Sequence, residues 1–207
     1  MHVTDAIQRR RSIRRFTDES VPATELREML ALASLAPSIG NRQMWRFIVI
    51  TGDMRDILYR MVERRVDDLS STTEMLRTPK RIETLRERAR VVAEAPAVIV
   101  VVNQGFHNEL ERVLVERGQR AAEVEQQLCH PDIQSVSAMI AFLLLTAEER
   151  GYGTCWMTDV LIAQRDFQAV LELQPEECIL ALIALGKPAE NPLPKDRKPI
   201  DDLIEWR

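Results

Sequence analysis

The sequence predicts an α+β or α/β sandwich, in which helices cover both faces of a buried sheet. Two apolar runs, 97–103 and 178–185, have the length and composition of strands that are buried on both faces, and the first is rich in β-branched residues. Segments with helical periodicity precede, separate and connect these runs. Because 207 residues suffice for one full hydrophobic core and are few for two, we expect a single domain over residues 1–207.

The first quarter of the chain is expected to form two helices and a strand. Thr4 can cap a short helix that ends within the arginine-rich stretch 9–16. The segment around Pro22 opens a second helix, whose apolar residues recur on one face: Leu26, Met29, Leu30 and Ala33. Proline, glycine and asparagine predict an ordered turn over 36–44, and the aromatic and β-branched run 45–51 predicts a strand buried on both faces.

The middle of the chain carries many charges. Asp53 can cap a long helical region that runs to about Arg90 and is interrupted near 70–73 and at Pro79. After the strand run comes a charged helical excursion at 105–128. It is either a lid or partner surface or a solvated surface helix, and charge alternation by itself favours the solvated helix.

The last third is expected to hold the core helix. Asp132 can cap it, and its apolar residues keep helical phase over four turns: Ile133, Val136, Ile140, Leu143, Leu144 and Ala147. Gly151 ends the helix and leads into a turn over 151–157. A helix around 165–173 and the second strand run follow. The proline-rich C-terminal arm at 187–207 cannot form a core of its own, so its apolar residues predict that it lies along another surface.

The stretch 9–16, RRRSIRRF, is an anomaly of charge. It holds five arginines, although the whole chain has a formal net charge of -4. One interpretation is a binding site for phosphate. The other is that the arginines are solvated and complement the partial negative charge of a helix C-terminus. The residues alone leave both interpretations open.

Several classes of function are disfavoured by composition and spacing. No run approaches the roughly 18 apolar residues of a membrane helix, and no signal-peptide pattern begins the chain, so we expect no membrane contact and a cytoplasmic protein. The acidic balance argues against a nucleic-acid partner. The three histidines and three cysteines lack metal-ligand spacing, so we expect no metal, and Cys155 reads as a buried core thiol.

No catalytic triad or complete glycine fingerprint is present. The string GYGTCW at 151–156 lacks the third glycine of a dinucleotide fingerprint and follows a helix, not a strand. The chain offers instead several turns rich in guanidinium, amide and hydroxyl donors. Such donors suit a phosphate, a polyol and the edge of a heterocycle, so together they predict a phosphorylated cofactor.

Four separated motifs resemble the FMN-dependent nitroreductase family, NAD(P)H-dependent flavin oxidoreductases. They are R-R-S-x-R-x-F, A-P-S-x-x-N-x-Q-x-W-x-F, G-x-G-T-C-W and L-P-K-x-R-x-P, in this order and over nearly the whole chain. The resemblance implies an α+β fold, a three-layer sandwich with a central, mostly antiparallel sheet flanked by helices. It also implies an intertwined homodimer with FMN at the interface. The chain departs from the family at Met44, where proline is usual.

The same resemblance assigns the cofactor-binding residues. The phosphate and ribityl chain of FMN would be held by Arg10, Arg11, Ser12 and Arg14, with Lys195 and Arg197 from the arm. The flavin would be contacted by Pro37, Ser38, Asn41 and Gln43, from the other subunit, and lined by Gly153, Thr154, Cys155, Trp156 and Met157. Arg9 and Arg15 match no requirement of the family and are expected to be solvated.

The resemblance implies that the flavin carries the chemistry, so no side chain is expected to be catalytic. We expect a ping-pong cycle, in which NADH or NADPH gives hydride to flavin N5 and an electron-deficient acceptor, such as a nitroaromatic or a quinone, then takes it. An alternative is another reaction of the same fold: dehalogenation, heterocycle dehydrogenation or flavin breakdown. A remote alternative is a non-enzymatic domain that binds an anionic partner through the stretch 9–16.

Overall fold

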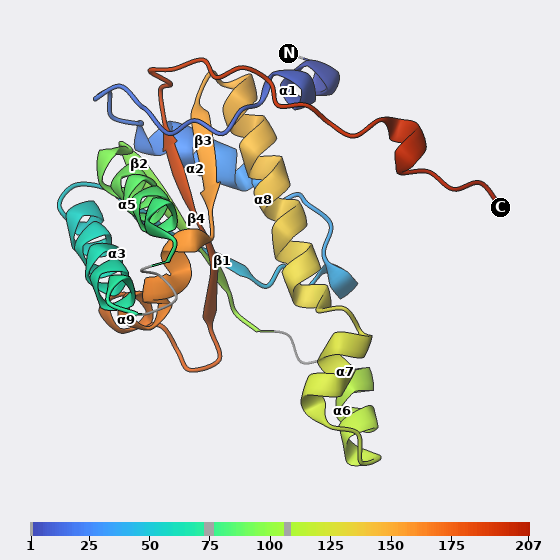
Figure 1. The fold of residues 1–207 in the computed structure, drawn as a ribbon. Coiled ribbons are helices and arrows are strands. Elements are labelled where there is room, and N and C mark those ends of the chain that lie inside the picture. Colours follow the sequence, from blue (N-terminus) through green and yellow to red (C-terminus); the bar gives the residue numbers. More distant parts are fainter. Residues whose placement is uncertain (1, 73–76, 106–108) are drawn as a thin grey trace.

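The fold is described from a computed structural model, which places residues 2–72, 77–105 and 109–207. Its centre is an antiparallel sheet of four strands in the order β1-β2-β4-β3. The strands are β1 (Trp45–Ile50), β2 (Ala97–Asn103), β3 (Gly153–Met157) and β4 (Cys178–Gly186). Helices cover both faces of this sheet (Figure 1). The fold is therefore the predicted α+β sandwich with an antiparallel sheet between two helical layers.

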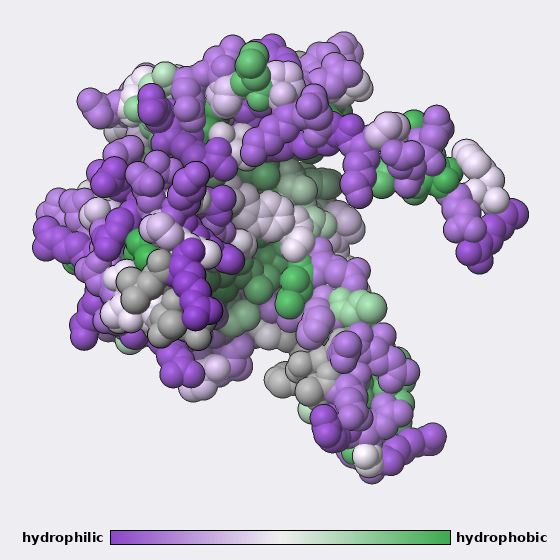
Figure 2. Space-filling view, viewed as in Figure 1, coloured by the Kyte–Doolittle hydropathy of each residue, from purple (hydrophilic) through white to green (hydrophobic). Residues whose placement is uncertain are grey.

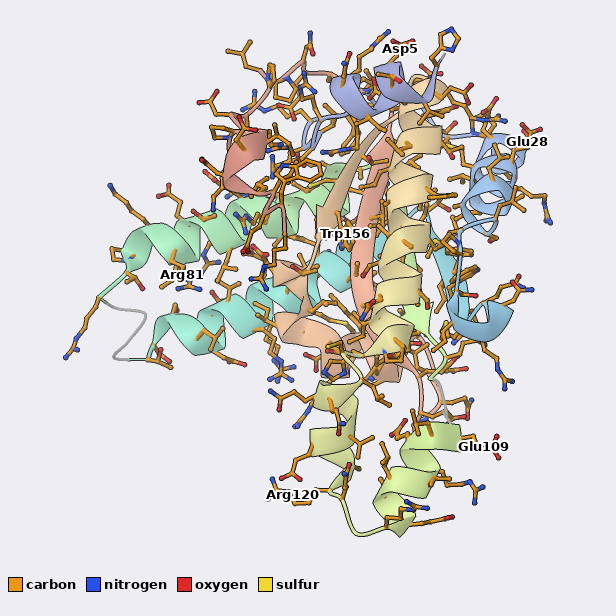
Figure 3. All side chains as sticks on the ribbon, turned by 90° about the vertical axis from the view of Figure 1, so that its right-hand side faces the viewer. Asp5, Glu28, Arg81, Glu109, Arg120 and Trp156 are labelled. Atoms are coloured by element: carbon orange, nitrogen blue, oxygen red, sulfur yellow. The ribbon has the colours of Figure 1, made fainter. Side chains whose placement is uncertain are left out.

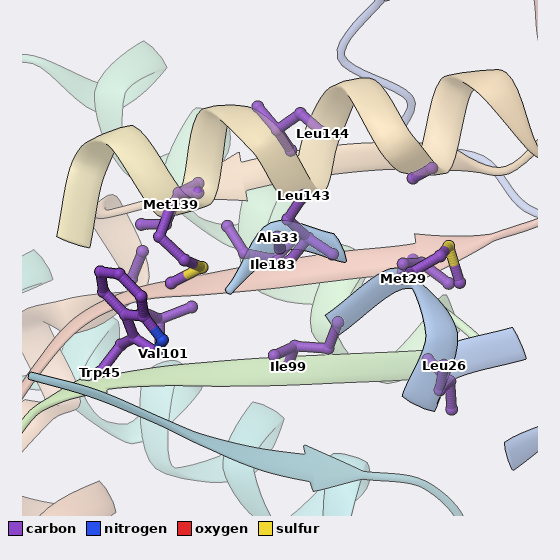
Figure 4. Close-up of a cluster of buried hydrophobic side chains, with 14 of the residues drawn as sticks. Leu26, Met29, Ala33, Trp45, Ile99, Val101, Met139, Leu143, Leu144 and Ile183 are labelled. Atoms are coloured by element: carbon purple, nitrogen blue, oxygen red, sulfur yellow. The ribbon is translucent and has the colours of Figure 1, made fainter. Parts of the chain in front are cut away.

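One helical layer consists of α2 (Ala23–Ala33) and α8 (Pro131–Glu149). The predicted apolar face of α2 is buried, as are most of the predicted positions of α8. Figure 4 shows their side chains against the sheet: Leu26, Met29 and Ala33 from α2, Met139, Leu143 and Leu144 from α8, and Ile99, Val101 and Ile183 from the strands. This layer fixes α8 along the sheet from one end to the other.

The other layer consists of α3 (Met54–Ser70), α5 (Pro79–Glu94), η2 (Asp159–Ala163) and α9 (Gln164–Val170). Alternate residues of a strand point to opposite faces, so β2 contributes to both layers, and all seven of its residues are buried as predicted. The same prediction is wrong for β1. It is an edge strand, and its Val49 remains 40% exposed.

Two segments project from the body. The first is a pair of helices, α6 (Glu109–Glu116) and α7 (Ala121–Gln127), which confirms the predicted helical excursion over those residues; 106–108 lie outside the described part. The second is the C-terminal arm, with the short helix η3 (Ile200–Asp202). In Figure 2 the surface between the two projections is hollowed and partly apolar.

Three local predictions are corrected by the structure. The helix α1 (Val3–Arg9) ends at Arg9, and its N-cap is His2, whose backbone N–H donates to the Asp5 carboxylate at 3.1 Å, so Thr4 is not the cap. Likewise the N-cap of α8 is His130. The carboxylate of Asp132 instead accepts a 2.6 Å bond from the buried Asn103 amide.

The third correction concerns 151–157, which is not simply a turn. Residues 153–157 form the edge strand β3, because their backbone pairs with β4 over five positions. The helix α1 ends at Arg9, the first residue of the stretch 9–16, and the rest of the stretch is not helical.

Candidate functional site

The arginine-rich stretch lies beside the free edge of β3. The N–H of Ile13 donates to the carbonyl of Thr154 at 2.9 Å, and Ser12 forms a parallel bridge with Thr154. Ile13 is buried, whereas Ser12 and Arg14 on either side of it are exposed. This alternation is that of an extended chain with one face on the protein. Arg14 therefore faces away from the core because Ile13 faces into it.

Gly153 permits this close approach. A Cβ atom at Gly153 would lie 2.6 Å, 2.8 Å and 3.0 Å from three atoms of the Ile13 side chain. Its backbone has no positive φ, so the requirement for glycine is one of space. The glycine of the third motif thus serves packing between β3 and the stretch 9–16.

The start of the C-terminal arm holds the same stretch from its other side. Thr17 donates to the carbonyl of Lys187 and Ala189 donates to the carbonyl of Arg15, both at 2.9 Å. The carboxylate of Glu190 then accepts from the backbone N–H of Arg14 at 2.6 Å and of Arg15 at 3.1 Å. Residues separated by about 175 positions are therefore joined by directed hydrogen bonds.

A cavity of about 630 Å³ opens where the stretch 9–16, the arm and α5 meet. It is lined by Ser12, Arg14, Arg15, Thr84, Glu87, Arg88, Arg90, Val91, Glu94, Glu190, Pro192 and Lys195. Five of these side chains are basic and three are acidic. We call it the phosphate cavity, because clustered guanidinium groups with a hydroxyl and an ammonium group are the donors that phosphate prefers.

A smaller cavity of about 220 Å³ adjoins it and shares Arg14, Arg88 and Val91. Its other lining residues are Cys155, Trp156, Met157 and Asp159. Trp156 is 39% exposed and lies on the face that Figure 3 turns toward the viewer, beside α8. We call this the ring cavity, since its lining offers an aromatic surface and apolar groups to a flat ligand.

Cys155 is buried, as predicted, and burial raises the pKa of its thiol, although Arg14 and Arg88 oppose the shift. A thiol with a raised pKa stays protonated at neutral pH and is a poor nucleophile. Its place in the site is therefore that of a small apolar group. Arg88 forms an ion pair with Asp159, which fixes one guanidinium group at the border of both cavities.

The predicted phosphate-binding residues separate into two sets. Ser12, Arg14 and Lys195 line the phosphate cavity, but Arg10 and Arg197 line neither cavity. The guanidinium group of Arg11 donates to the carbonyls of residues 8, 9 and 10 at 2.7 Å to 3.0 Å, where it caps α1. Arg15 lines the phosphate cavity, although it was expected to be only solvated. Arg9 is mostly exposed, and its Nε lies 3.7 Å from Oε1 of Glu148.

The second group of predicted residues, Pro37, Ser38, Asn41 and Gln43, surrounds the helix η1 (Ile39–Asn41). The Ser38 hydroxyl accepts from the backbone N–H of Gln43 at 3.0 Å, and the side-chain amide of Gln43 donates to Asn41. Gly40, Asn41 and Gln43 all have positive φ, which confirms the predicted ordered turn. The group is thus an ordered turn whose Asn41 and Gln43 side chains are exposed and hydrogen-bonded to each other.

This turn and the stretch 9–16 lie at opposite ends of α8. The Ile39 N–H donates to Ser135 in the first turns of α8, whereas Arg9 lies beside Glu148 in its last turn. A helix of 19 residues spans about 28 Å. One chain therefore does not bring both predicted groups to one cavity.

Among the lining residues that were missed from the sequence, Arg88 and Glu190 make directed contacts that hold the site. Arg88 is one of many charges on α5, and only the tertiary contact with η2 distinguishes it. Glu190 lies in a polar arm without periodicity, and its role depends on the distant amides of Arg14 and Arg15. No local pattern marks either residue.

Metal sites and membrane-spanning helices are absent from the described residues. Within 2–72, 77–105 and 109–207, no group of three or more histidine, cysteine or acidic side chains is arranged to hold a metal ion. None of the helices described is long and apolar enough to cross a membrane. The two cavities are therefore the chemically distinctive features found around the stretch 9–16.

Comparison with known proteins bears on this arrangement. Residues 7–187 match the model of the nitroreductase family. The chain is 31% identical over 202 residues to an NADH dehydrogenase of Thermus thermophilus, covering 98% of this chain and 94% of that protein.

Among the solved structures that share the fold, two illustrate the similarity. One is a BluB-like flavoprotein from Clostridium difficile, with a TM-score of 0.87, 25% identity and coverage of 100% and 99% of the two chains. The other is a protein from Desulfovibrio desulfuricans, described as a nitroreductase and solved with FMN, with a TM-score of 0.71, 26% identity and coverage of 100% and 97%.

The match of the family model extends from within α1 to the residue that follows β4, and thus includes all four strands and the stretch 9–16. The chain belongs to the nitroreductase family.

Proposed function

We propose that this protein is an FMN-dependent oxidoreductase that passes a hydride from NADH or NADPH to an electron-deficient small molecule. The observation that carries the proposal is the convergence of Ser12, Arg14 and Lys195 on one cavity, from the two ends of the chain and beside β3. The FMN bound by the Desulfovibrio desulfuricans relative and the name of the Thermus thermophilus relative support the cofactor and the donor.

The residues present fit FMN. Arg14, Ser12 and Lys195 would hold its phosphate through charge-assisted hydrogen bonds. Cys155, Trp156 and Met157 would lie along its ring in the ring cavity. When bound, the flavin supplies the hydride chemistry, so the protein needs only to bind, orient and tune it.

Arg88 is the tuning residue in this proposal. Its guanidinium group borders the ring cavity, where positive charge would stabilise negative charge that develops on a bound ring. The ion pair with Asp159 holds this group in one place and moderates its charge. No side chain of the site is needed as an acid or base.

We further propose that the site is completed by a second copy of the chain. The turn at Ser38 to Gln43 lies at the end of α8 opposite the phosphate cavity, so within one chain it has no access to that cavity. The arm exposes five large apolar side chains and extends away from its own body (Figure 1): Leu193, Ile200, Leu203, Ile204 and Trp206. Burying such residues against a partner is favourable by roughly 25 cal/mol per Å².

The test is the absorption spectrum of the purified protein after reconstitution with FMN, recorded before and after anaerobic addition of NADH or NADPH. We expect a bound flavin spectrum that bleaches with one or both donors and returns when a nitroaromatic or a quinone is added. A protein that binds no FMN would refute the proposal as a whole. Bound FMN that neither donor bleaches would refute the donor, and would favour dehalogenation, heterocycle dehydrogenation or flavin breakdown.

A further inference from the structure

A third cavity, of about 600 Å³, runs along α5 and meets the other two. It is lined by Leu69 of α3, by Arg81, Thr84, Leu85 and Arg88 of α5, and by Asp159 and Ile162 of η2. We call it the α5 groove. It shares Thr84 and Arg88 with the phosphate cavity and Arg88 and Asp159 with the ring cavity. The groove therefore adjoins the ring cavity at the Arg88–Asp159 ion pair.

Among the residues that the structure describes, the groove combines apolar walls with one cation, Arg81, that has no acidic partner. Leu69, Leu85 and Ile162 supply the walls. The Thr84 hydroxyl donates to the carbonyl of Lys80 at 2.9 Å, so its donor is engaged, and the charge of Arg88 is paired with Asp159 at the border with the ring cavity.

Arg81 is the other cationic group among the described residues that line the groove. Its guanidinium group has no acidic partner within the part of the chain that the structure describes, and it is exposed. Residues 81, 84 and 88 follow helical spacing, so they present one face of α5 to the groove (Figure 3 labels Arg81 on α5). An unpaired guanidinium group at the outer part of an apolar groove is suited to a carboxylate or a phosphate.

We propose that the α5 groove binds part of the molecule that reacts in the ring cavity, namely an apolar part that ends in an anionic group. Arg81 determines the preference for the anion. The inference rests on the proposed function and adds a substrate class to it: acceptors or donors that carry a negative charge. The anion is either the carboxylate of an aromatic acceptor or a phosphate of the nicotinamide donor. The volume of the groove lies within the range of small-molecule sites.

The experiment measures equilibrium binding to the FMN-loaded, oxidised protein by isothermal titration calorimetry. The probes are 4-nitrobenzoate, the neutral analogue 4-nitrobenzamide, NADH and NADPH. The variant is Arg81→Glu. The matched control is Lys80→Glu, which makes the same change of charge at the neighbouring exposed position, turned by about 100° on the helix and outside the groove.

If the anion belongs to the acceptor, Arg81→Glu weakens binding of 4-nitrobenzoate about fivefold or more, while binding of 4-nitrobenzamide changes less than about twofold. If it belongs to the donor, Arg81→Glu weakens binding of NADH or NADPH and spares both nitro compounds. Either result supports the groove, provided that Lys80→Glu leaves all four affinities within about twofold of native.

Equal effects of the two variants, or no effect of Arg81→Glu on any anionic probe, would overturn the inference. The measurement does not depend on hydride transfer. A flavin that no donor reduces, in a protein that binds 4-nitrobenzoate through Arg81, would refute the proposed donor and leave the groove in place. A flavin that NADH or NADPH reduces, in a protein whose binding of the four probes does not depend on Arg81, would support the proposed donor and overturn the groove.

Discussion

Gly153→Ala tests whether the packing of the stretch 9–16 on β3 builds the phosphate cavity. The added Cβ would lie 2.6 Å from Cγ1 of Ile13, and ordinary contact begins near 3.4 Å, so the side chain must move by about 0.8 Å. Ile13 is buried and its N–H is bonded to Thr154, which leaves little room for that movement. Overpacking of this kind costs about 1–3 kcal/mol. Because Ser12 and Arg14 flank Ile13, we expect FMN affinity to fall as well, by about tenfold.

The assay is urea unfolding of the apoprotein followed by circular dichroism, together with titration of FMN by its fluorescence. Gly52→Ala is the control, because a Cβ there meets nothing within 4 Å and only its positive φ is strained. It should lose about 1 kcal/mol of stability and keep its affinity for FMN. In Gly153→Ala with Ile13→Ala, two of the three close contacts vanish, so the losses should be less than additive. An unchanged stability and FMN affinity in Gly153→Ala would refute the reasoning.

Three further predictions follow from the contacts of the arm and the sheet. Glu190→Ala removes the acceptor for the backbone N–H groups of Arg14 and Arg15 and should weaken FMN binding about tenfold. Glu190→Gln keeps an oxygen acceptor and should bind FMN within about threefold of the native affinity. Similar losses of affinity in both variants would show that the charge of Glu190, and not its acceptor oxygen, matters. A chain ending at residue 198 keeps Lys195 but loses the apolar end of the arm. Analytical ultracentrifugation should show weaker dimers, and FMN titration should show weaker FMN binding. A monomer that binds FMN tightly would exclude the two-subunit site. The hydrogen bonds from Arg46 and from the backbone of residue 174 lower the pKa of Glu177. The ionised carboxylate therefore stabilises the fold above the unfolded pKa of about 4.3, and this stabilisation is lost as pH falls through the lower folded pKa. In urea unfolding from pH 7 to pH 3, the difference in unfolding free energy between native protein and Glu177→Gln should shrink in that acidic range, and a constant difference would contradict the prediction.

Much of the fold could be predicted from local pattern. The runs 97–103 and 178–185 could be predicted as strands, because continuous apolar runs of strand length suit a sheet that is buried on both faces. The helical phase of Leu26, Met29 and Ala33 identified a buried helix face in the same way. Proline, glycine and asparagine identified the turn near Asn41, since few other residues accept its positive φ. The motifs also pointed to the stretch 9–16 and to the arm.

The tertiary structure decided how these segments meet. A run of arginines has no periodicity, so only the pairing of Ile13 with Thr154 makes the stretch extended and aims Arg14 at the phosphate cavity. Arg88 and Glu190 join the site through contacts with residues far away in the sequence. Hydrophobic periodicity and turn chemistry act over a few neighbouring residues, so the sequence determined the elements and the donor-rich segments. Packing and directed hydrogen bonds between distant segments determined which of them share a cavity and which lie at opposite ends of α8.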